Sequence, residues 1–353
     1  MSLNLRYKRI IALSLIFVLM IGIVSTVYFV QRQPVPAVAT DVDVLSSGDS
    51  GTSSDYIKYV EFNPTYTALS KALQADIDAH NKGISRNWIT LLAYLAAKYG
   101  GDFSKFKSSD FNNLIEELDS GQTMDELTAN MQYYNYYLKA YTAVLGGLVG
   151  GYQEQRDDGS GNLVWVEKYG LIGFSPIAKG FPFTDYNDFG VQRTYGYTRR
   201  HLGHDLFAQT GTPVIAVEGG TVEELGWNQY GGWRIGIRSD DGLRYYYYAH
   251  LRQNRPYAEG MEIGKQVQAG DVIGYVGRTG YSATENVNGL DTSHLHLGLE
   301  LIFDESQKEG SNQIWVNLYA LTMLLQTHQG DTVRDPDTKE YTRKYQIKVE
   351  STE

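Results

Sequence analysis

The chain has 353 residues, 42% of them hydrophobic, and a formal net charge of −10. This length suggests roughly two domains, and the negative charge argues against nucleic-acid binding, for which a basic patch is expected. Cysteine is absent, which excludes disulfides and thiolate metal sites. Any metal ion would therefore need histidine and carboxylate ligands.

The N-terminus contains an uncharged stretch of 21 residues at 10–30. A helix of that length spans roughly 30 Å, the thickness of the hydrocarbon core of a membrane. Basic residues precede it, so we expect a cytoplasmic N-terminus at 1–9, a single-pass transmembrane anchor at 10–30 and the main domains outside the cell membrane. The alternative is a cleaved signal peptide with Ala37-Val38-Ala39 as its cleavage site, which would release a secreted protein.

Residues 31–55 are rich in Pro, Ser, Gly and Asp and indicate a flexible linker. Residues 56–150 predict a small helical accessory domain, because apolar residues recur there at three- and four-residue spacings. Thr123 and Glu126 have the spacing of a capping box. His80 ends a predicted helix, where a favourable interaction with the helix dipole explains it better than metal binding.

The tyrosine-rich stretch YYNYYLKAY at 133–141 allows two interpretations. It is either a helix that packs its tyrosines into a core, which we favour, or a strip on which sugars stack.

From about residue 151 to 330 glycine is frequent, and short β-type runs alternate with turns. We expect an α+β protein whose C-terminal domain, 151–330, is mainly antiparallel β-sheet. The segment 312–326 has a helical pattern, and residues 331–353 are predicted to be a polar C-terminal tail.

Five of the seven histidines fall between 201 and 296. In the stretch HLHLGLEL at 294–301, a strand would place His294 and His296 on one face and four leucines on the other. These histidines are either part of a reactive site or residues of a solvated strand face. His250, which ends the aromatic run YYYYA, would by itself be interpreted as a core histidine.

The stretch HLGHD at 201–205 is ambiguous when taken alone. In a straight strand His201 and Asp205 would lie about 13 Å apart, too far to share a metal ion. Gly203 between them permits the bend that sharing requires. His204 would face the opposite way, and we leave it out of the site.

Five motifs occur in order: HxGxD (201–205), GTPVIAVEGGTV (211–222), YAHL (248–251), GKQVQAGDVIGYVGRTG (264–280) and HLHLGLEL (294–301). Together they resemble the lysostaphin-like, or LytM-type, zinc metalloendopeptidases of bacterial cell walls, over about a third of the chain. The resemblance implies antiparallel sheets in a duplicated hybrid motif and one bound zinc ion. It implies zinc ligands at His201, Asp205 and His296, and catalytic histidines at His250 and His294.

The resemblance also implies that the substrate is a peptide of peptidoglycan and that proteins of the cell-wall machinery are partners. One alternative is a non-catalytic LytM-type scaffold or activator in wall remodelling, division or sporulation. Non-catalytic relatives commonly lack zinc ligands, whereas this sequence has all of them. Another is a wall-binding module in which the helical region does the main work. Residues 281–293 are longer than the family's usual connection, and we expect this loop to border the cleft.

Overall fold

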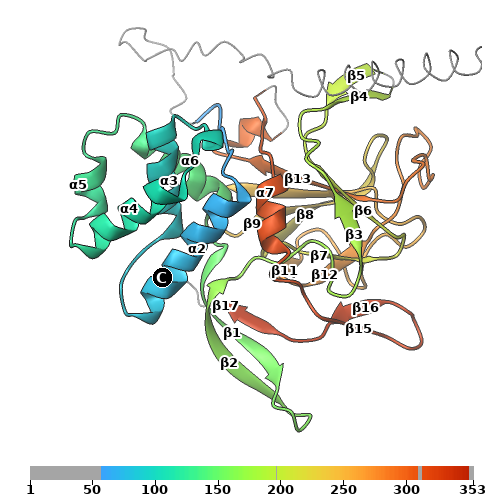
Figure 1. Cartoon of the computed structure of the whole chain (residues 1–353). Helices are drawn as coiled ribbons and strands as arrows, with labels where there is room; N and C mark the ends of the chain where they lie inside the picture. Colours follow the sequence, from blue (N-terminus) through green and yellow to red (C-terminus); the bar gives the residue numbers. More distant parts are fainter. Residues whose placement is uncertain (1–56, 196, 309–311, 350–353) are drawn as a thin grey trace, which may run out of the picture. The chain divides into compact units, whose positions relative to one another are not determined.

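The computed structural model describes residues 57–195, 197–308 and 312–349 (Figure 1). The expected anchor at 10–30 and the linker at 31–55 lie outside the described residues. Contacts divide the chain into a unit at 1–54 and a unit at 55–353, and the described residues all belong to the second unit. In this described part, no helix combines the length and the apolar character needed to cross a membrane.

Helices fill the region between residues 66 and 145, as the apolar spacing predicts (Figure 1). The capping box is confirmed, because Thr123 and Glu126 exchange both of its hydrogen bonds at the start of α5. The elements are α2 (Tyr66–Asn81), α3 (Trp88–Tyr99), η1 (Phe103–Lys105), α4 (Ser108–Asp119), α5 (Met124–Thr128) and α6 (Tyr134–Leu145).

Residues of the tyrosine-rich stretch lie in α6 and support the core interpretation. Tyr134, Tyr137 and Tyr141 are buried and pack in one cluster with the apolar residues of α2 and α3. His80 lies in the last turn of α2, where its ring stacks on that of Tyr169 with centroids 3.7 Å apart.

An antiparallel eight-stranded sheet forms the centre of the described unit, which confirms the mainly-β prediction for the C-terminal region. Its strand order is β11-β8-β9-β10-β13-β6-β3, and β14 pairs with β13. The bounds are β3 (Phe183–Asp185), β6 (His204–Ala208), β8 (Gly220–Asn228), β9 (Gly232–Ser239), β10 (Arg244–Ala249), β11 (Gln266–Val267), β13 (Leu295–Leu301) and β14 (Ile314–Trp315).

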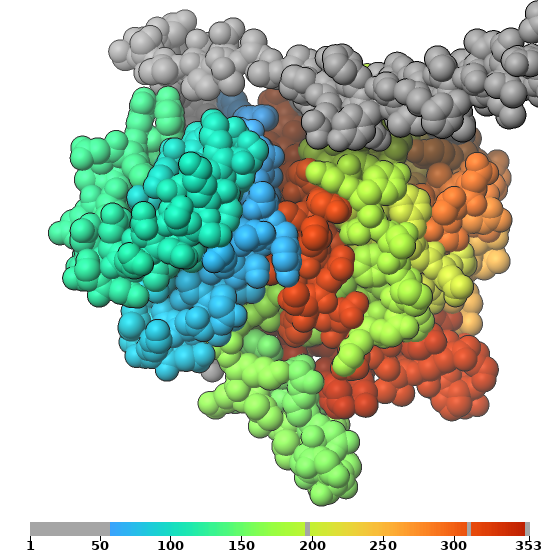
Figure 2. All heavy atoms as spheres, viewed as in Figure 1, coloured from blue at the N-terminus to red at the C-terminus, as the bar shows by residue number. Residues whose placement is uncertain are grey.

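Smaller sheets surround this one. The strands are β1 (Val149–Asp157), β2 (Leu163–Leu171), β4 (Gln192–Tyr195), β5 (Tyr197–Arg200), β7 (Pro213–Ile215), β12 (Val272–Tyr275), β15 (Thr332–Arg334), β16 (Tyr341–Arg343) and β17 (Ile347–Val349). A short 3-10 helix, η2 (Glu305–Gln307), follows β13. The β1–β2 hairpin projects from the body of the molecule (Figure 2).

The helices and the central sheet share one continuous hydrophobic core. A polar connection accompanies it: Arg244 of β10 is 1% exposed, forms an ion pair with Glu218 and donates to the carbonyl oxygen of Ala143 in α6. An unpaired buried guanidinium would be costly, so this network fixes the end of α6 against the sheet.

The C-terminal third differs from the expected pattern in two places. Residues 312–326 do not form one helix. The first part contains β14, which pairs with β13, and the helix α7 covers only Tyr319–Leu325. At the start of α7, the side chain of Asn317 accepts a hydrogen bond from the Tyr319 amide. Backbone pairing therefore overrides the helical pattern. The predicted polar tail contains β15, β16 and β17, and β17 pairs with β1 and buries Ile347.

Candidate metal centre and cleft

The register of the central sheet brings two acid–base side chains together. On β13, His296 lies directly opposite Asp205 of β6 on one side and Ala249 of β10 on the other. Directly opposed residues of antiparallel strands point to the same face of the sheet. The leucines at 295, 297, 299 and 301 on the other face are at most 1% exposed, so packing holds β13 in this register.

His201 reaches the same point because the chain bends before β6. A Cβ atom added at Gly203 would lie 2.5 Å from Cε1 of His296, closer than any real contact. Glycine is therefore required for this close approach. The bend places Nε2 of His201 3.0 Å from Oδ1 of Asp205 and 2.8 Å from Nδ1 of His296.

These three residues form the group in the described chain that can hold a metal ion, with ligand atoms all within 4.8 Å of one another. Nδ1 of His296 lies 3.0 Å from Oδ1 of Asp205. Donors that are each ~2.1 Å from a tetrahedral zinc ion would be separated by roughly 3.4 Å, so a small opening of this triangle accommodates zinc. Two imidazoles and one carboxylate match a zinc set that leaves the fourth position for water.

The electrostatics of the triangle favour a charged carboxylate. Burial opposes ionisation of Asp205, but hydrogen bonds from His201 and His296 outweigh it and hold its pKa well below the usual range. Burial also opposes protonation of His201, yet hydrogen bonds to Asp188 and Asp205 raise its pKa to about 9. Burial lowers the pKa of His296.

His250 and His294 lie beside the triangle, with ring centroids 4.8 Å apart. Nδ1 of His250 donates to the carbonyl oxygen of Thr279 at 2.9 Å, and Nδ1 of His294 donates to that of Thr292 at 2.9 Å. Carbonyl oxygens only accept, so Nε2 is the nitrogen that each neutral ring keeps free. Burial, followed by the charges of the neighbouring histidines, holds the pKa of His250 well below its usual value.

The backbone at His250 is unusual, because its φ of 61° lies in the left-handed region. Such a conformation persists in a non-glycine residue only when its surroundings enforce it. Here the amide of His250 donates to the carbonyl oxygen of Gly231 at 2.7 Å, and its ring is anchored at Thr279. The sequence offered no signal for this conformation.

His204, which the strand pattern excluded from the site, faces away from the triangle. It is 1% exposed, and its Nε2 lies 3.0 Å from Oδ2 of Asp185 on β3.

A cleft of about 550 Å³ opens above the triangle, and all five predicted site residues line it. None of its described lining residues comes from the helices between 66 and 145. One wall is formed by Arg199, whose guanidinium lies 5.0 Å from the ring centroids of both Tyr230 and Tyr281. Arg199 also donates to the hydroxyl of Tyr281 at 2.8 Å. No motif in the sequence indicated this wall.

The loop 281–293 borders the cleft through Tyr281 and Leu290. Its centre is held elsewhere: the Asn286 side chain accepts from Nε1 of Trp233 at 2.9 Å and from the Asn254 amide at 2.8 Å. The Gln253 side chain donates to the Asn286 carbonyl oxygen at 2.6 Å. The loop thus contributes one edge of the cleft, whose lining also includes the three residues of the triangle.

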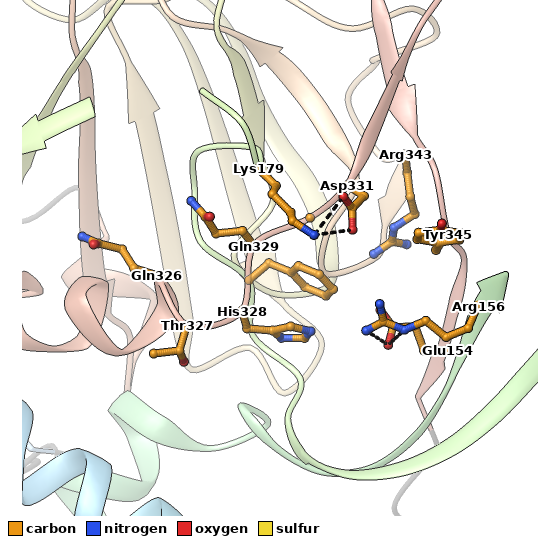
Figure 3. A pocket seen from close by; sticks show the side chains of 12 residues that line it. Glu154, Arg156, Lys179, Gln326, Thr327, His328, Gln329, Asp331, Arg343 and Tyr345 are labelled. Atoms are coloured by element: carbon orange, nitrogen blue, oxygen red, sulfur yellow. Dashed lines mark hydrogen bonds and ion pairs between the residues drawn. The ribbon is translucent and has the colours of Figure 1, made fainter. Parts of the chain in front are cut away.

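A second, smaller pocket lies away from the five predicted site residues, between β1 and the C-terminal strands, and its lining includes His328 (Figure 3). Four of its charged side chains pair within the pocket, Lys179 with Asp331 and Arg156 with Glu154. Arg343 pairs instead with Asp271. His328 packs against Phe174 with ring centroids 4.0 Å apart. Two of these contacts, those of Asp331 and His328, join the C-terminal segment to earlier parts of the chain and indicate a structural role for this pocket.

Comparison with known proteins agrees with this geometry. Residues 199–334 match the family model "Peptidase family M23". The L-Ala–D-Glu endopeptidase of Bacillus subtilis is 36% identical over 179 residues, which are 50% of this chain and 49% of that protein. Lysostaphin of Staphylococcus simulans is 38% identical over 89 residues, 25% of this chain and 17% of that protein. The chain thus spans half or less of the length of these relatives.

The crystal structure of a LytM protein from Ruminococcus gnavus has the same fold, with a TM-score of 0.50 and 26% identity. The similarity covers 75% of this chain and 89% of that one. The family match, these relatives and the His–Asp–His triangle agree. Residues 199–334 of this chain therefore form a domain of peptidase family M23.

Proposed function

We propose that this protein is a zinc-dependent endopeptidase that hydrolyses peptide bonds in peptidoglycan, in its cross-links or its stem peptides. The observation that carries the proposal is the convergence of five side chains at the floor of one cleft. Nε2 of His201, Oδ1 of Asp205 and Nδ1 of His296 form the ligand triangle. Nε2 of His250 and of His294 stay free beside it.

When bound, zinc would lower the pKa of a coordinated water towards ~7 and polarise the scissile carbonyl. His294 is placed to accept a proton from the attacking water, since its Nε2 lies 3.8 Å from the ligand oxygen of Asp205. The proton that His294 takes up at Nε2 can then be returned to the leaving amine. Nε2 of His250 can accept a hydrogen bond from the attacking water and so help to orient it. Leu290 and the Arg199 wall bound the space into which a peptide would enter.

We also propose that the stretch at 10–30 anchors the protein in the cell membrane, with its N-terminus inside and the peptidase domain outside. Secretion after signal cleavage is the alternative. Proteins of the cell-wall machinery are proposed partners. The name of one relative, an L-Ala–D-Glu endopeptidase, supports hydrolysis of a peptide bond.

The test is to incubate the full chain, purified in detergent, with isolated cell walls and to measure its zinc content. Mass spectrometry of the released fragments would identify the new ends and so distinguish L-Ala–D-Glu, glycyl-glycine and D-alanyl bonds. We expect one zinc per chain and new peptide ends. His294→Ala should keep zinc and lose cleavage, while His80→Ala, a histidine far from the triangle in sequence and exposed on α2, should behave like wild type.

Wall cleavage that is unchanged in His294→Ala would refute the mechanism. A chain that binds walls but neither holds zinc nor cleaves them would instead be the non-catalytic scaffold or activator.

A further inference from the structure

Asp188 lies directly behind the metal ligands, and no sequence motif identified it. The residue is 0% exposed. Its carboxylate oxygen Oδ2 accepts from the Arg193 guanidinium at 2.6 Å and lies 3.2 Å from Nδ1 of His201. Its main-chain oxygen lies 3.1 Å from the same nitrogen. A fully buried carboxylate thus contacts a metal ligand on the side away from the metal.

This contact fixes which nitrogen of His201 faces the metal. The main-chain oxygen and Oδ2 of Asp188 face Nδ1 of His201 and can only accept a hydrogen bond, so Nδ1 carries a proton. Nε2 is then the nitrogen available to the triangle, where it points at Asp205 and His296. A carboxylate on the outer nitrogen of a histidine ligand orients the ring and raises its basicity.

Arg193 extends the connection to a second ligand. The same guanidinium nitrogen that contacts Asp188 lies 3.1 Å from Oδ2 of Asp205. The other oxygen of Asp205, Oδ1, is the one that faces both ligand histidines. Arg193 thereby leaves a single Asp205 oxygen directed at the metal position.

The backbone holds this arrangement in place. The Gly190 amide donates to the carbonyl oxygen of His201 at 2.7 Å, and the His201 amide donates to that of Val191 at 2.9 Å. Within the loop, the Val191 amide donates to the carbonyl oxygen of Asp188 at 3.2 Å. These hydrogen bonds therefore tie the segment 188–191 to His201.

We propose that Asp188 and Arg193 are positioning residues that set the orientation of His201 and Asp205 for the metal. The proposal rests on the proposed function, since it assumes that these ligands hold zinc. Asp188 acts through His201, and Arg193 acts through Asp205.

The first experiment compares zinc affinity, measured by competition with a chromophoric chelator, in wild type and Asp188→Asn. Removing the carboxylate should weaken zinc binding 10- to 100-fold, the range typical of such outer-shell partners. The matched control is Asp185→Asn, because Asp185 also pairs with a histidine, His204, that does not belong to the triangle. Its zinc affinity should stay within about twofold of wild type.

The second experiment uses Arg193→Gln and Arg193→Lys. The visible absorption of the cobalt-substituted protein reports ligand geometry and does not depend on turnover. Arg193→Gln should change this spectrum and lower hydrolysis about tenfold, whereas Arg193→Lys, which keeps a cationic donor for both carboxylates, should largely restore both. Thermal melting of the metal-free variants shows whether each one is folded. If Asp188→Asn does not fold, the Arg193 pair decides the proposal.

Two results would overturn the inference while leaving the proposed function intact. One is a zinc affinity of folded Asp188→Asn that lies within threefold of wild type. The other is a cobalt spectrum of Arg193→Gln that is the same as that of wild type. A wild-type chain that binds no zinc would refute the proposed function itself.

Discussion

Asp205 and His296 face each other directly across the ladder between β6 and β13. Two of the three proposed metal ligands are therefore placed by backbone pairing. A slip of one residue in this pairing would send one side chain to the opposite face of the sheet. The buried leucines of β13 prevent that slip, so the geometry of the metal centre depends on the core beneath it.

Gly203→Ala should abolish tight metal binding while leaving the chain folded. The added methyl group would overlap the His296 ring and lie 2.8 Å from the carbonyl oxygen of Leu297. The bend that delivers His201 would have to open, and we expect at least a tenfold loss of zinc affinity. The loss of affinity can be measured as the zinc content that remains after dialysis. Leu202→Ala, at the neighbouring and 38% exposed position, is the control and should retain zinc.

Zinc binding should release a proton from His201 near neutral pH. In the metal-free protein the pKa of His201 is raised to about 9, so zinc must displace a proton below that pH. Affinity should rise about tenfold per pH unit between 6.5 and 9 and then level off. Calorimetry in buffers of different ionisation enthalpy counts the proton, and binding without proton release at pH 7 would contradict the prediction.

The same pKa predicts the stability of the metal-free chain. Because the pKa of His201 is raised in the folded state, its contribution is fully present below about 6.5 and is lost as pH rises through 9. Zinc-loaded protein should not show this loss. Melting temperatures of the two forms across this pH range provide the comparison.

Glu300→Gln should remove a loss of stability that develops as pH rises from about 4.5 to 8. Burial raises the pKa of Glu300 to about 8, and its Oε1 has no hydrogen-bond partner in the described residues. Folding therefore favours the protonated acid, and wild-type stability should fall as pH rises from about 4.5 to 8. Each tenfold change in proton affinity is worth roughly 1.4 kcal/mol, so the total is at most about 5 kcal/mol.

Denaturant unfolding at pH 5 and pH 9 tests this prediction, with Glu305→Gln as the control because Glu305 has a largely exposed side chain. An equal pH dependence in wild type and Glu300→Gln would show that another group is responsible.

Asn286→Ala should change substrate binding more than chemistry. The substitution removes the hydrogen bonds that tie the loop 281–293 to Trp233 and Asn254, and it places alanine at a φ of 61°. The loop edge at Tyr281 and Leu290 should lose definition while the ligands stay in place. We expect KM to rise severalfold with zinc content unchanged. Steady-state kinetics on a soluble wall peptide would show a fall in kcat alone if the loop instead acts on the reacting groups.

The part of the site that lies in regular strands could be predicted from the sequence. Alternation in HLHLGLEL correctly placed its leucines in the core, and the order of five motifs indicated the fold. From the sequence, a bend at Gly203 could be predicted only because His201 and Asp205 would otherwise lie too far apart to share a metal ion. The reason that this position must be glycine is the close approach of the His296 ring, which comes from a distant strand. The left-handed backbone of His250 depends on contacts with Gly231 and Thr279, which are distant in sequence. Asp188 contacts residues 5 and 13 positions along the chain, but only the fold of the intervening loop brings them together, and no local pattern encodes it.

Short strands were the main failure of prediction for the same reason. β14 and β17 contain two and three residues, and their partners lie in β13 and β1. A strand this short has too few residues to show a period, so its identity comes from the pairing partner.

The network of Arg244, Glu218 and Ala143 has a consequence for how this protein can diversify. It fixes the helical region to the sheet, yet the helices contribute no described residue to the cleft. Substitutions on the outer surface of α2 to α6 can therefore change that surface without altering the described lining of the cleft. The helical surface and the cleft can thus vary separately within a single folded unit.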